Sequence, residues 1–463
     1  MSEIVLGQAE RHWPRLAALS LVMLLPSLGT SIANVALPTL AASFDATMSE
    51  VQWVVIAYLL AVTSLIVSAG RLGDIIGRRR LLLTGIAVFA VGAAAAAVAP
   101  DLRVLILARG VQGAGAAVMM SLTIAMVGEL VPKDRTGAAM GLLGTVSAVG
   151  TALGPSLGGA MIAAFGWPSV FAALALMGIG ALLIGRALFP ADAEAAVRTA
   201  GFDSIGTVLL ALSLLAFTVT LTMGAQLSPV GISGLAALAG FGFGAFVWHQ
   251  ARTPAPLVRL DLLRDRGLST GLASLALVSV IVMATLVAGP FYLSQVLGLG
   301  SFETGLVMSV GPVVAALTGA PAGRLVDRAG SHRVMVAGLV PVIAGSVLLA
   351  ALPARFGVGG YLTGLVLITS GYALFQAANT TSIMQGATSD RRGVTSALLG
   401  LSRNLGLITG ASAMGTVYAL GPFFADTLGL RSGDAAGLRS TFVVATVLAG
   451  LALGISLWCR RPG

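Results

Sequence analysis

The residues of this chain that could do chemistry inside a membrane are few, and the charged ones among them are basic. Arg109 and Arg403 fall within long apolar stretches, whereas no aspartate or glutamate lies in the middle of such a stretch. A charge at the centre of a bilayer costs at least ~2.5 kcal/mol, so each arginine should face a partner or a cavity, or reach the interface. Glu129, at the inner end of a stretch, and Asp74, in a loop, are the nearest groups that could carry a proton.

Arrangements typical of other chemistry are missing. The lysine, Lys133, lies in the segment ELVPKDRT, which does not match the phosphate-binding loop that ATP-dependent proteins use. The histidines, His12, His249 and His332, have no second ligand at metal spacing. The sole cysteine, Cys459, cannot form an intramolecular disulfide. We therefore expect no metal site and no cofactor, and we do not expect an enzyme.

Long apolar stretches are the elements that must position these residues. Hydrophobic residues make up 57% of the chain and charged residues 10%, against about 25% charged in soluble domains. Each stretch is near or above the ~20 residues that a helix needs to cross the hydrocarbon core. The sequence therefore predicts an all-α polytopic membrane protein with fourteen transmembrane helices. In chain order these spans are 16–41, 51–70, 81–99, 104–128, 137–163, 170–188, 205–224, 229–248, 268–297, 302–322, 334–352, 361–385, 394–420 and 438–458.

The basic residues gather on one side of these spans. If the first span starts inside, the inner loops, both tails and the inner ends of spans hold 21 of the 27 lysines and arginines, and the outer loops and outer span ends hold four. This is the positive-inside bias, so both termini are predicted to be cytoplasmic. The net charge of +9 therefore reports topology, and we expect no nucleic-acid partner. The preference for arginine over lysine, with 60 glycines, favours a bacterial plasma (inner) membrane protein from a GC-rich genome.

One loop motif occurs twice. Residues 70–80 read GRLGDIIGRRR and residues 323–333 read GRLVDRAGSHR, an offset of 253. Aligning the two copies pairs spans 1–6 with spans 9–14 and leaves spans 7 and 8 as an inserted hairpin. Two six-helix halves with a substrate site between them are a known transporter architecture. We therefore predict a 6+2+6 arrangement. Its parts are an N-terminal bundle at 1–190, a hairpin at 191–250, and a C-terminal bundle with an amphipathic cytoplasmic linker at 251–463.

The repeated motif has a physical logic as a gating element. A tight link between helices needs glycine where φ is positive or where backbones nearly touch. An aspartate in such a link can accept hydrogen bonds at the start of a neighbouring helix. Asp74 should therefore approach the start of span 13 near Gly393, and Asp327 the start of span 5 near Gly137, when the cavity faces out. The gating candidates in the two copies are Gly70, Arg71, Asp74, Gly77 and Arg78, and Gly323, Arg324 and Asp327.

Span 5 carries small residues at helical spacing. Gly150, Gly154 and Gly158 recur every four residues, and together with Gly159 they permit another helix to approach closely. Pro155 cannot donate to the helical ladder and bends or loosens the helix. We predict that span 10 packs and slides on this kinked surface. Ordinary small-residue packing is the alternative.

Five segments carry a resemblance to the major facilitator superfamily, and within it to the fourteen-span drug:proton antiporters. GRLGDIIGRRR resembles the family's motif between spans 2 and 3. LGTSIANVALP resembles a first-span motif, LARGVQGAGAA a fourth-span motif built on an arginine, and GTALGPSLGG a fifth-span motif associated with exporters. PLVRLDLLRDRG is similar to the group's link into the second half. The segments lie at 70–80, 28–38, 107–117, 150–159 and 256–267.

The resemblance implies roles for residues inside the spans. It favours Arg109 as a residue that controls protonation or contacts substrate over simple snorkelling, whereas Arg403 is equally explained as a tie between helices. Glu129 joins them as a candidate for proton coupling. Polar cavity candidates come from the spans that line the cavity in this superfamily: Asn34, Gln112, Tyr292, Gln295, Gln376 and Asn379. Met119, Met120, Phe291 and Phe375 are candidates for apolar walls. For each of these, helix packing is the alternative.

The chain departs from the resemblance at Gly29. The fourteen-span group usually carries an aspartate at this place in the first span, a candidate carrier of protons or of substrate charge. Its absence, with Arg109 and Arg403 as the charges well inside spans, suits neutral or anionic cargo better than cationic cargo. Proton coupling is then not expected to run through the first span.

The functional expectation is a proton-coupled secondary active exporter of small amphipathic drugs or metabolites, working by alternating access. Dedicated export of one endogenous metabolite, antibiotic or lipid is the alternative within this class. A transporter-like membrane receptor or scaffold without coupling is the alternative from another class. The expected partners are a small-molecule substrate, protons and the lipid bilayer, and the chain is expected to be a monomer.

Overall fold

The computed structural model describes residues 2–130, 136–189, 202–223, 228–254, 256–386, 392–423 and 435–458. Within these ranges the chain is helical and contains no strand. This is the outcome expected in lipid, where a helix satisfies its own backbone hydrogen bonds. The first-half helices are α1 (Ser2–Ser43), α2 (Met48–Val51), α3 (Trp53–Ile76), α4 (Arg78–Ala97), α5 (Leu102–Leu130), α6 (Thr136–Phe165) and α7 (Pro168–Leu188). They are followed by α8 (Ser204–Met223), α9 (Pro229–Arg252), η2 (Leu262–Arg264), α10 (Arg266–Phe291), η3 (Tyr292–Val296), α11 (Ser301–Ala329), α12 (Ser331–Ala351), α13 (Pro353–Gly386), α14 (Arg392–Thr409), η4 (Gly410–Met414), α15 (Gly415–Ala419) and α17 (Ala436–Trp458).

Thirteen helices in the described ranges are long and apolar enough to cross a membrane. The all-α polytopic prediction is confirmed. The predicted thirteenth span, which α14, the π-helix η4 and the short helix α15 cover, is not among the thirteen. Together these three elements cover Arg392–Ala419. The count of fourteen spans therefore remains a prediction.

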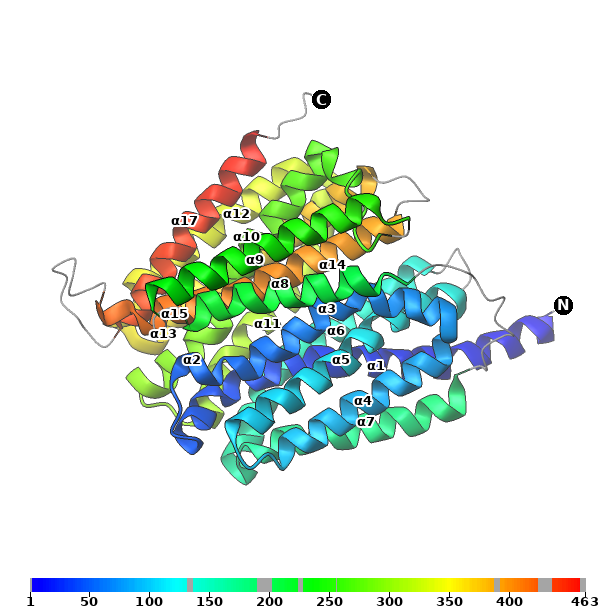
Figure 1. The fold of residues 1–463 in the computed structure, drawn as a ribbon, viewed down its shortest axis with the longest axis horizontal. Coiled ribbons are helices and arrows are strands. Elements are labelled where there is room, and N and C mark those ends of the chain that lie inside the picture. The colour runs from blue at the N-terminus through cyan, green and yellow to red at the C-terminus, as the bar shows by residue number, and fades with distance from the viewer. Residues whose placement is uncertain are drawn as a thin grey trace.

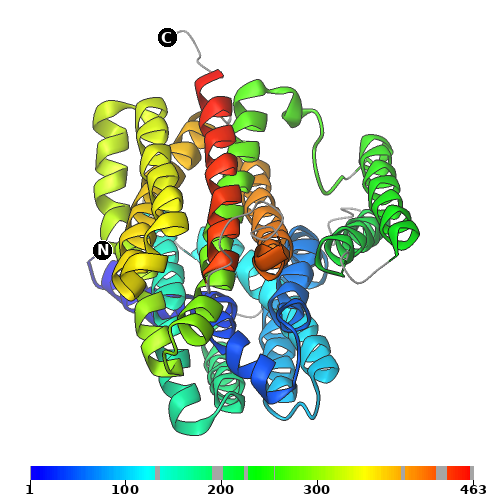
Figure 2. The same ribbon diagram turned by 90° about the vertical axis from the view of Figure 1, so that its left-hand side faces the viewer.

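The helices form two bundles and a separate pair (Figure 1). Helices α1 and α3–α7 pack against one another, as do α10–α14 and α17. Helices α8 and α9 pair with each other and lie to one side of both bundles (Figure 2). Hydrophobic clusters fill each bundle, and the one in the N-terminal bundle also takes in Met283, Val287 and Phe291 from α10. We call these parts the N-terminal half, the C-terminal half and the hairpin.

Two glycines turn the chain at equivalent places in the repeated motif. Gly77, between α3 and α4, has φ 100°, and Gly330, between α11 and α12, has φ 84°. Only glycine adopts such values without strain, which confirms the expectation of a positive φ in this link. The two copies of the motif are therefore equivalent in backbone structure as well as in sequence.

The glycine face of α6 packs against a different helix from the one predicted. Side-chain carbons added at Gly150, Gly154 and Gly158 would collide with residues 24–32 of α1. At these three glycines the expectation of α11 (span 10) was wrong, because this part of α6 is used for close packing within its own half; at Pro155 and Gly159 of the predicted surface, α11 does pack on α6. Helix α11 instead meets the neighbouring face, where Gly159 lies against the Ser301 backbone and Gly305 lies against Pro155.

Contacts between the two halves gather at one end of the molecule. We call this end, predicted to be extracellular, the outer end and the opposite one the inner end. Besides the α6–α11 contact, Thr39 Oγ1 lies 3.4 Å from Ser301 Oγ, and a side chain on Gly415 would collide with the carboxamide of Gln52. Towards the inner end of α11, an added carbon at Gly323 would have nothing within 4 Å. The outer end is therefore closed in this state.

Candidate functional site

Arg109 is held at the meeting point of three helices of the N-terminal half. Its side chain, on α5, is fully buried. The guanidinium donates from Nε to the Val54 carbonyl of α3 at 3.0 Å and from Nη2 to the Gly29 carbonyl of α1 at 3.1 Å. Nη1 donates to Gln112 Oε1 at 2.6 Å. Helix carbonyls and one carboxamide therefore solvate the charge without an acidic partner among the described residues.

Aromatic rings complete the surroundings of this guanidinium. Its central carbon lies 4.2 Å from the ring centre of Tyr58 and 5.8 Å from that of Phe171. Such cation–π contacts strengthen when desolvated. The Tyr58 hydroxyl donates to the Pro26 carbonyl of α1 at 2.9 Å. A carbon added at Gly29 would lie 3.5 Å from this hydroxyl and 3.5 Å from the Phe89 ring, both ordinary contacts, so the position has room for a methyl group.

Several polar side chains of this half are buried with unused hydrogen-bonding atoms. In the described part of the chain, Asn34 Oδ1, Gln112 Nε2 and both carboxamide atoms of Gln52 have no partner. Asn34 Nδ2 bonds only within α1, to the Thr30 carbonyl at 2.9 Å. Of the predicted cavity residues, the structure thus brings Gln112 to Arg109. Gln52, which sequence reasoning missed, lies at the outer closure against Gly415.

Arg403 on α14 has a different environment from Arg109. Its side chain is half-buried, and it forms no hydrogen bond with any residue in the described ranges. Its charge interacts electrostatically with the nearby phenol of Tyr372, on α13. The neighbouring Asn404 and Ser402 are buried, and Ser402 ties α14 to α10 through the Leu272 carbonyl at 2.6 Å. Ser402 makes the helix–helix tie for which Arg403 was one candidate.

The two copies of the loop motif differ in their contacts. Asp74 Oδ1 accepts from Arg78 Nη2 at 2.7 Å and from Arg78 Nε at 3.1 Å. Arg78 also donates to the Ala125 carbonyl of α5 at 3.3 Å, which ties the loop to its own half. Asp327, the equivalent residue, is exposed. Its predicted approach to Gly137 and that of Asp74 to Gly393 concern the outward-facing state and remain predictions.

Other predicted cavity residues lie elsewhere. Tyr292 is buried at the outer end, where its hydroxyl donates to the Pro353 carbonyl at 2.9 Å and its ring stacks on Tyr361. The prediction that Tyr292 lines the cavity is wrong. Tyr292 begins the π-helix η3, and its ring lies in the packed core of the C-terminal half. Gln295 is exposed at the same end, and Gln376 is half-buried in α13.

Most of the predicted wall residues belong to the packed core. Met119, Phe291 and Phe375 are buried in the hydrophobic clusters, and Met120 is half-buried against the first of them. Asn379 is buried and donates to the Gly271 carbonyl at 3.1 Å. The side chain of Glu129 lies outside the described residues. Among the residues described, no group of three acidic, histidine or cysteine side chains could hold a metal ion.

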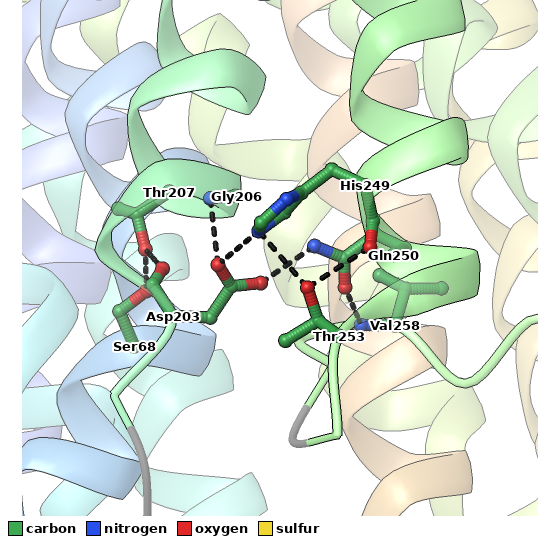
Figure 3. Close-up of polar contacts among 8 residues, drawn as sticks. All are labelled: Ser68, Asp203, Gly206, Thr207, His249, Gln250, Thr253 and Val258. Atoms are coloured by element: carbon green, nitrogen blue, oxygen red, sulfur yellow. Dashed lines mark hydrogen bonds and ion pairs between the residues drawn. The ribbon is translucent and has the colours of Figure 1, made fainter.

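A polar network at the inner end of the hairpin escaped sequence reasoning (Figure 3). Asp203, just before α8, accepts from His249 Nε2 and Gln250 Nε2 of α9, each at 2.7 Å, and from the Gly206 amide at 2.8 Å. Gln250 Oε1 in turn accepts from the Val258 amide of the linker at 3.0 Å. The antiparallel pairing of spans 7 and 8 brings these residues together. That pairing was the feature of the sequence from which the network could have been predicted.

The network fixes the hairpin to both of its neighbours. Burial alone would raise the pKa of Asp203, but the hydrogen bonds from Gly206, His249 and Gln250 and the His249 charge lower it below its ordinary value of 3.8. Beside it, the Ser68 and Thr207 hydroxyls lie 2.6 Å apart and join α8 to α3 (Figure 3). At the outer end, Thr416 Oγ1 donates to the Leu221 carbonyl of α8 at 2.8 Å. Hydrogen bonds therefore join the hairpin to the N-terminal half at its inner end and to the C-terminal half at its outer end.

Comparisons with known proteins agree with this architecture. Residues 19–411 match the family model described as Major Facilitator Superfamily. Multidrug resistance protein Stp of Mycobacterium tuberculosis is 31% identical over 407 residues, which cover 87% of this chain and 75% of the relative. The tetracenomycin C resistance and export protein of Streptomyces glaucescens is 28% identical over 427 residues, 91% of this chain and 79% of the relative. The fold superposes with a TM-score of 0.70 on a crystal structure of a bacterial homologue of the human lysosomal transporter Spinster, 15% identical, covering 98% of this chain and 99% of that one.

Proposed function

Because this chain belongs to the Major Facilitator Superfamily, a family of membrane transporters, we propose that it is a proton-coupled secondary active exporter of small amphipathic compounds. The observation that carries the proposal is its similarity along most of its length to proteins named for multidrug resistance and for antibiotic resistance and export. The driving force is sufficient, since one charge crossing 100 mV releases ~2.3 kcal/mol, enough for a roughly fiftyfold gradient.

Alternating access would work through the two faces of α6. Its glycine face is locked onto α1, so these helices would move as one body. Its other face meets α11, and at the outer end Gly159 and Pro155 lie directly against Gly305. At these small residues the two helices can separate without unthreading large side chains. Opening of the outer end would also release the Gln52 carboxamide, whose atoms have no partner among the described residues, to water.

We further propose that the cargo is neutral or anionic. The carbonyls around Arg109 leave this guanidinium no exposed surface, so in this state it cannot touch cargo. Arg403 is half-buried and makes no hydrogen bond with described residues, so an anionic or strongly polar group could approach it. Proton coupling would then involve groups near the inner end, with Glu129 and Asp74 as candidates, because Gly29 provides no carboxylate in the first span.

The domain arrangement and topology extend this proposal. The N-terminal half at 1–190, the hairpin at 191–250 and the C-terminal half at 251–463 would act as three units of a monomer in the bacterial inner membrane. Both termini would be cytoplasmic. A reporter fused after Gly463 should be active only inside the cell; activity outside the cell would reverse the topology.

Transport into everted membrane vesicles tests the function directly. Vesicles that contain the chain should accumulate neutral or anionic fluorescent compounds when a pH gradient is imposed, and dissipating the gradient should stop accumulation. Strong uptake of quaternary ammonium dyes alone would overturn the proposed cargo class. Uptake without dependence on the gradient would overturn proton coupling, and no uptake of any class would favour the receptor alternative.

Dedicated export of one compound is the second candidate function. The similarity to a protein named for resistance to and export of tetracenomycin C favours it. The same vesicles distinguish the two, because a dedicated exporter should be inhibited by one compound and its close analogues and not by unrelated amphipathic compounds.

A further inference from the structure

A pocket opens at the inner end of the C-terminal half, away from the interface between the halves. Its volume is about 330 Å³, which is within the range of small-molecule sites. The described residues around it come from the linker and from the inner ends of α10, α12, α13, α14 and α17. None of them belongs to the N-terminal half or to the hairpin.

Two buried residues line this pocket with hydroxyl groups that bond to no described residue. Ser274 of α10 is 1% exposed and Thr395 of α14 is 3% exposed, and neither bonds to another residue in the described ranges. Asn379 uses its amide nitrogen for the Gly271 carbonyl, but its Oδ1 accepts from no described residue. These atoms are available to a bound molecule.

Two carboxylates line the pocket. Asp261 and Asp265 of the linker line it, with His332 of α12 as the other titratable group, and no arginine or lysine is among the described residues around it. Asp265 Oδ1 accepts from the Leu268 amide at 3.0 Å as the N-cap of α10. Asp261 pairs with Arg259 at 3.1 Å in an exposed position, which offsets part of its charge. An ammonium group would be attracted here, whereas an anion would meet two carboxylates.

Apolar side chains form the rest of the wall. Leu262 is 7% exposed and Ile383 is 7% exposed, and Met335 packs against the same hydrophobic cluster. We propose that this pocket binds a small amphipathic amine from the cytoplasm. Its ammonium group lies at Asp261 and Asp265, its apolar body lies against Ile383 and Met335, and the Ser274 and Thr395 hydroxyls bond to its polar substituents. This ligand is distinct from the exported cargo, and the site does not depend on the proposed transport.

Calorimetric titration of the full chain in lipid nanodiscs tests the proposal, with 2-phenylethylamine as the probe and its neutral N-acetyl derivative as the comparison. The amine should bind at least tenfold more tightly. Asp265→Asn should remove at least tenfold of that affinity while preserving the helix, because asparagine caps as well as aspartate. The matched control is Asp101→Asn, since Asp101 caps α5 through the Val104 amide at 2.9 Å on the opposite side of the membrane. It should leave binding unchanged.

Thr395→Val provides a second test, because valine keeps the shape and removes only the hydroxyl. It should weaken binding of the amine severalfold without lowering the melting temperature, since the hydroxyl bonds to no described residue. Equal binding of the amine and its acetylated form would overturn the proposal, as would an Asp265→Asn chain with unchanged affinity. A Thr395→Val chain that melts earlier yet binds normally would assign the hydroxyl to packing and would also overturn it.

Discussion

The two halves of the molecule hold their membrane arginines and their loop aspartates in opposite conditions. In the N-terminal half, Arg109 is fully buried and bonded to two helix carbonyls and Gln112, and Asp74 is bonded to Arg78. In the C-terminal half, Arg403 is half-buried without a hydrogen bond to a described residue, and Asp327 is exposed. A charged side chain that makes its hydrogen bonds within its own half holds that half together. A charged side chain without such bonds can respond to cargo, protons or the opposite half.

Replacing Arg109 should produce the largest effect. Arg109→Gln removes the bonds that join α5 to α1 and α3, so we expect loss of transport and a loss of about 2 kcal/mol in stability. Arg109→Lys should not rescue, because a single ammonium cannot match the planar guanidinium fork. Thermal unfolding in detergent measures stability and vesicle uptake measures transport. A normally stable Arg109→Gln chain would mean that the guanidinium is not the tie between helices.

Replacing Arg403 should separate function from stability. Arg403→Gln removes a charge that bonds to no described residue, so the melting temperature should stay within a degree or two. Transport of anionic compounds should fall at least tenfold, and that of neutral compounds should fall less. Ser402→Ala is the matched control, because it removes the hydrogen bond from α14 to the Leu272 carbonyl and should act on stability. If Arg403→Gln unfolds the protein instead, the contrast between the halves fails.

Adding an acid beside Arg109 should alter the cargo preference severalfold. At Gly29 a side chain would lie in ordinary contact with the Tyr58 hydroxyl and near the donors of Arg109. Gly29→Asp should therefore fold, partly neutralise the arginine and shift transport towards cations. Gly29→Ser controls for the added volume without the charge. An unchanged ratio of cationic to anionic uptake would show that this region does not read cargo charge.

The two loop aspartates should differ in the state they affect. Asp74→Asn breaks a partly exposed pair with Arg78, a loss of about 0–1 kcal/mol, so protein levels should hold while transport falls. Asp327→Asn, which lacks such a pair in this state, should leave stability unchanged and slow transport if its carboxylate is used when the inner end closes. Unchanged transport in both variants would mean that the motif only fixes the orientation of the chain in the membrane.

Asp203 offers a smaller test, in the hairpin, of the rule that a charged side chain bonded within its own part of the molecule stabilises that part. Its carboxylate has protein donors on both oxygens, so Asp203→Asn should lower stability by about 1 kcal/mol and loosen α8 from α9. Because its pKa is lowered on folding, its contribution is present above 3.8 and is lost as the pH falls through the lower folded value. Thermal unfolding between pH 3 and pH 7 measures this. A His249→Ala chain should reproduce part of the loss, and identical profiles for all three chains would contradict it.

Sequence patterns predicted the helices, the repeat and its turn glycines, because these depend on features that lie close together along the chain. Apolar length decides where a helix can cross lipid, and Gly77 and Gly330 occupy turns that need a positive φ. The partner of the α6 glycines could not be predicted in this way. A glycine face fits any neighbouring helix, and the packing of the whole half selected α1.

The sequence by itself thus determined an all-helical, multi-pass membrane protein with related halves, since composition and periodicity are enough for that. Only the tertiary structure decided how the charges are used. Arg109 is solvated by backbone carbonyls, which every residue possesses and no sequence pattern marks. The inner pocket joins Asp265, Ser274 and Thr395, which come from helix ends far apart along the chain. Their roles follow from which donors and acceptors remain unused after packing, and that depends on the assembled helices.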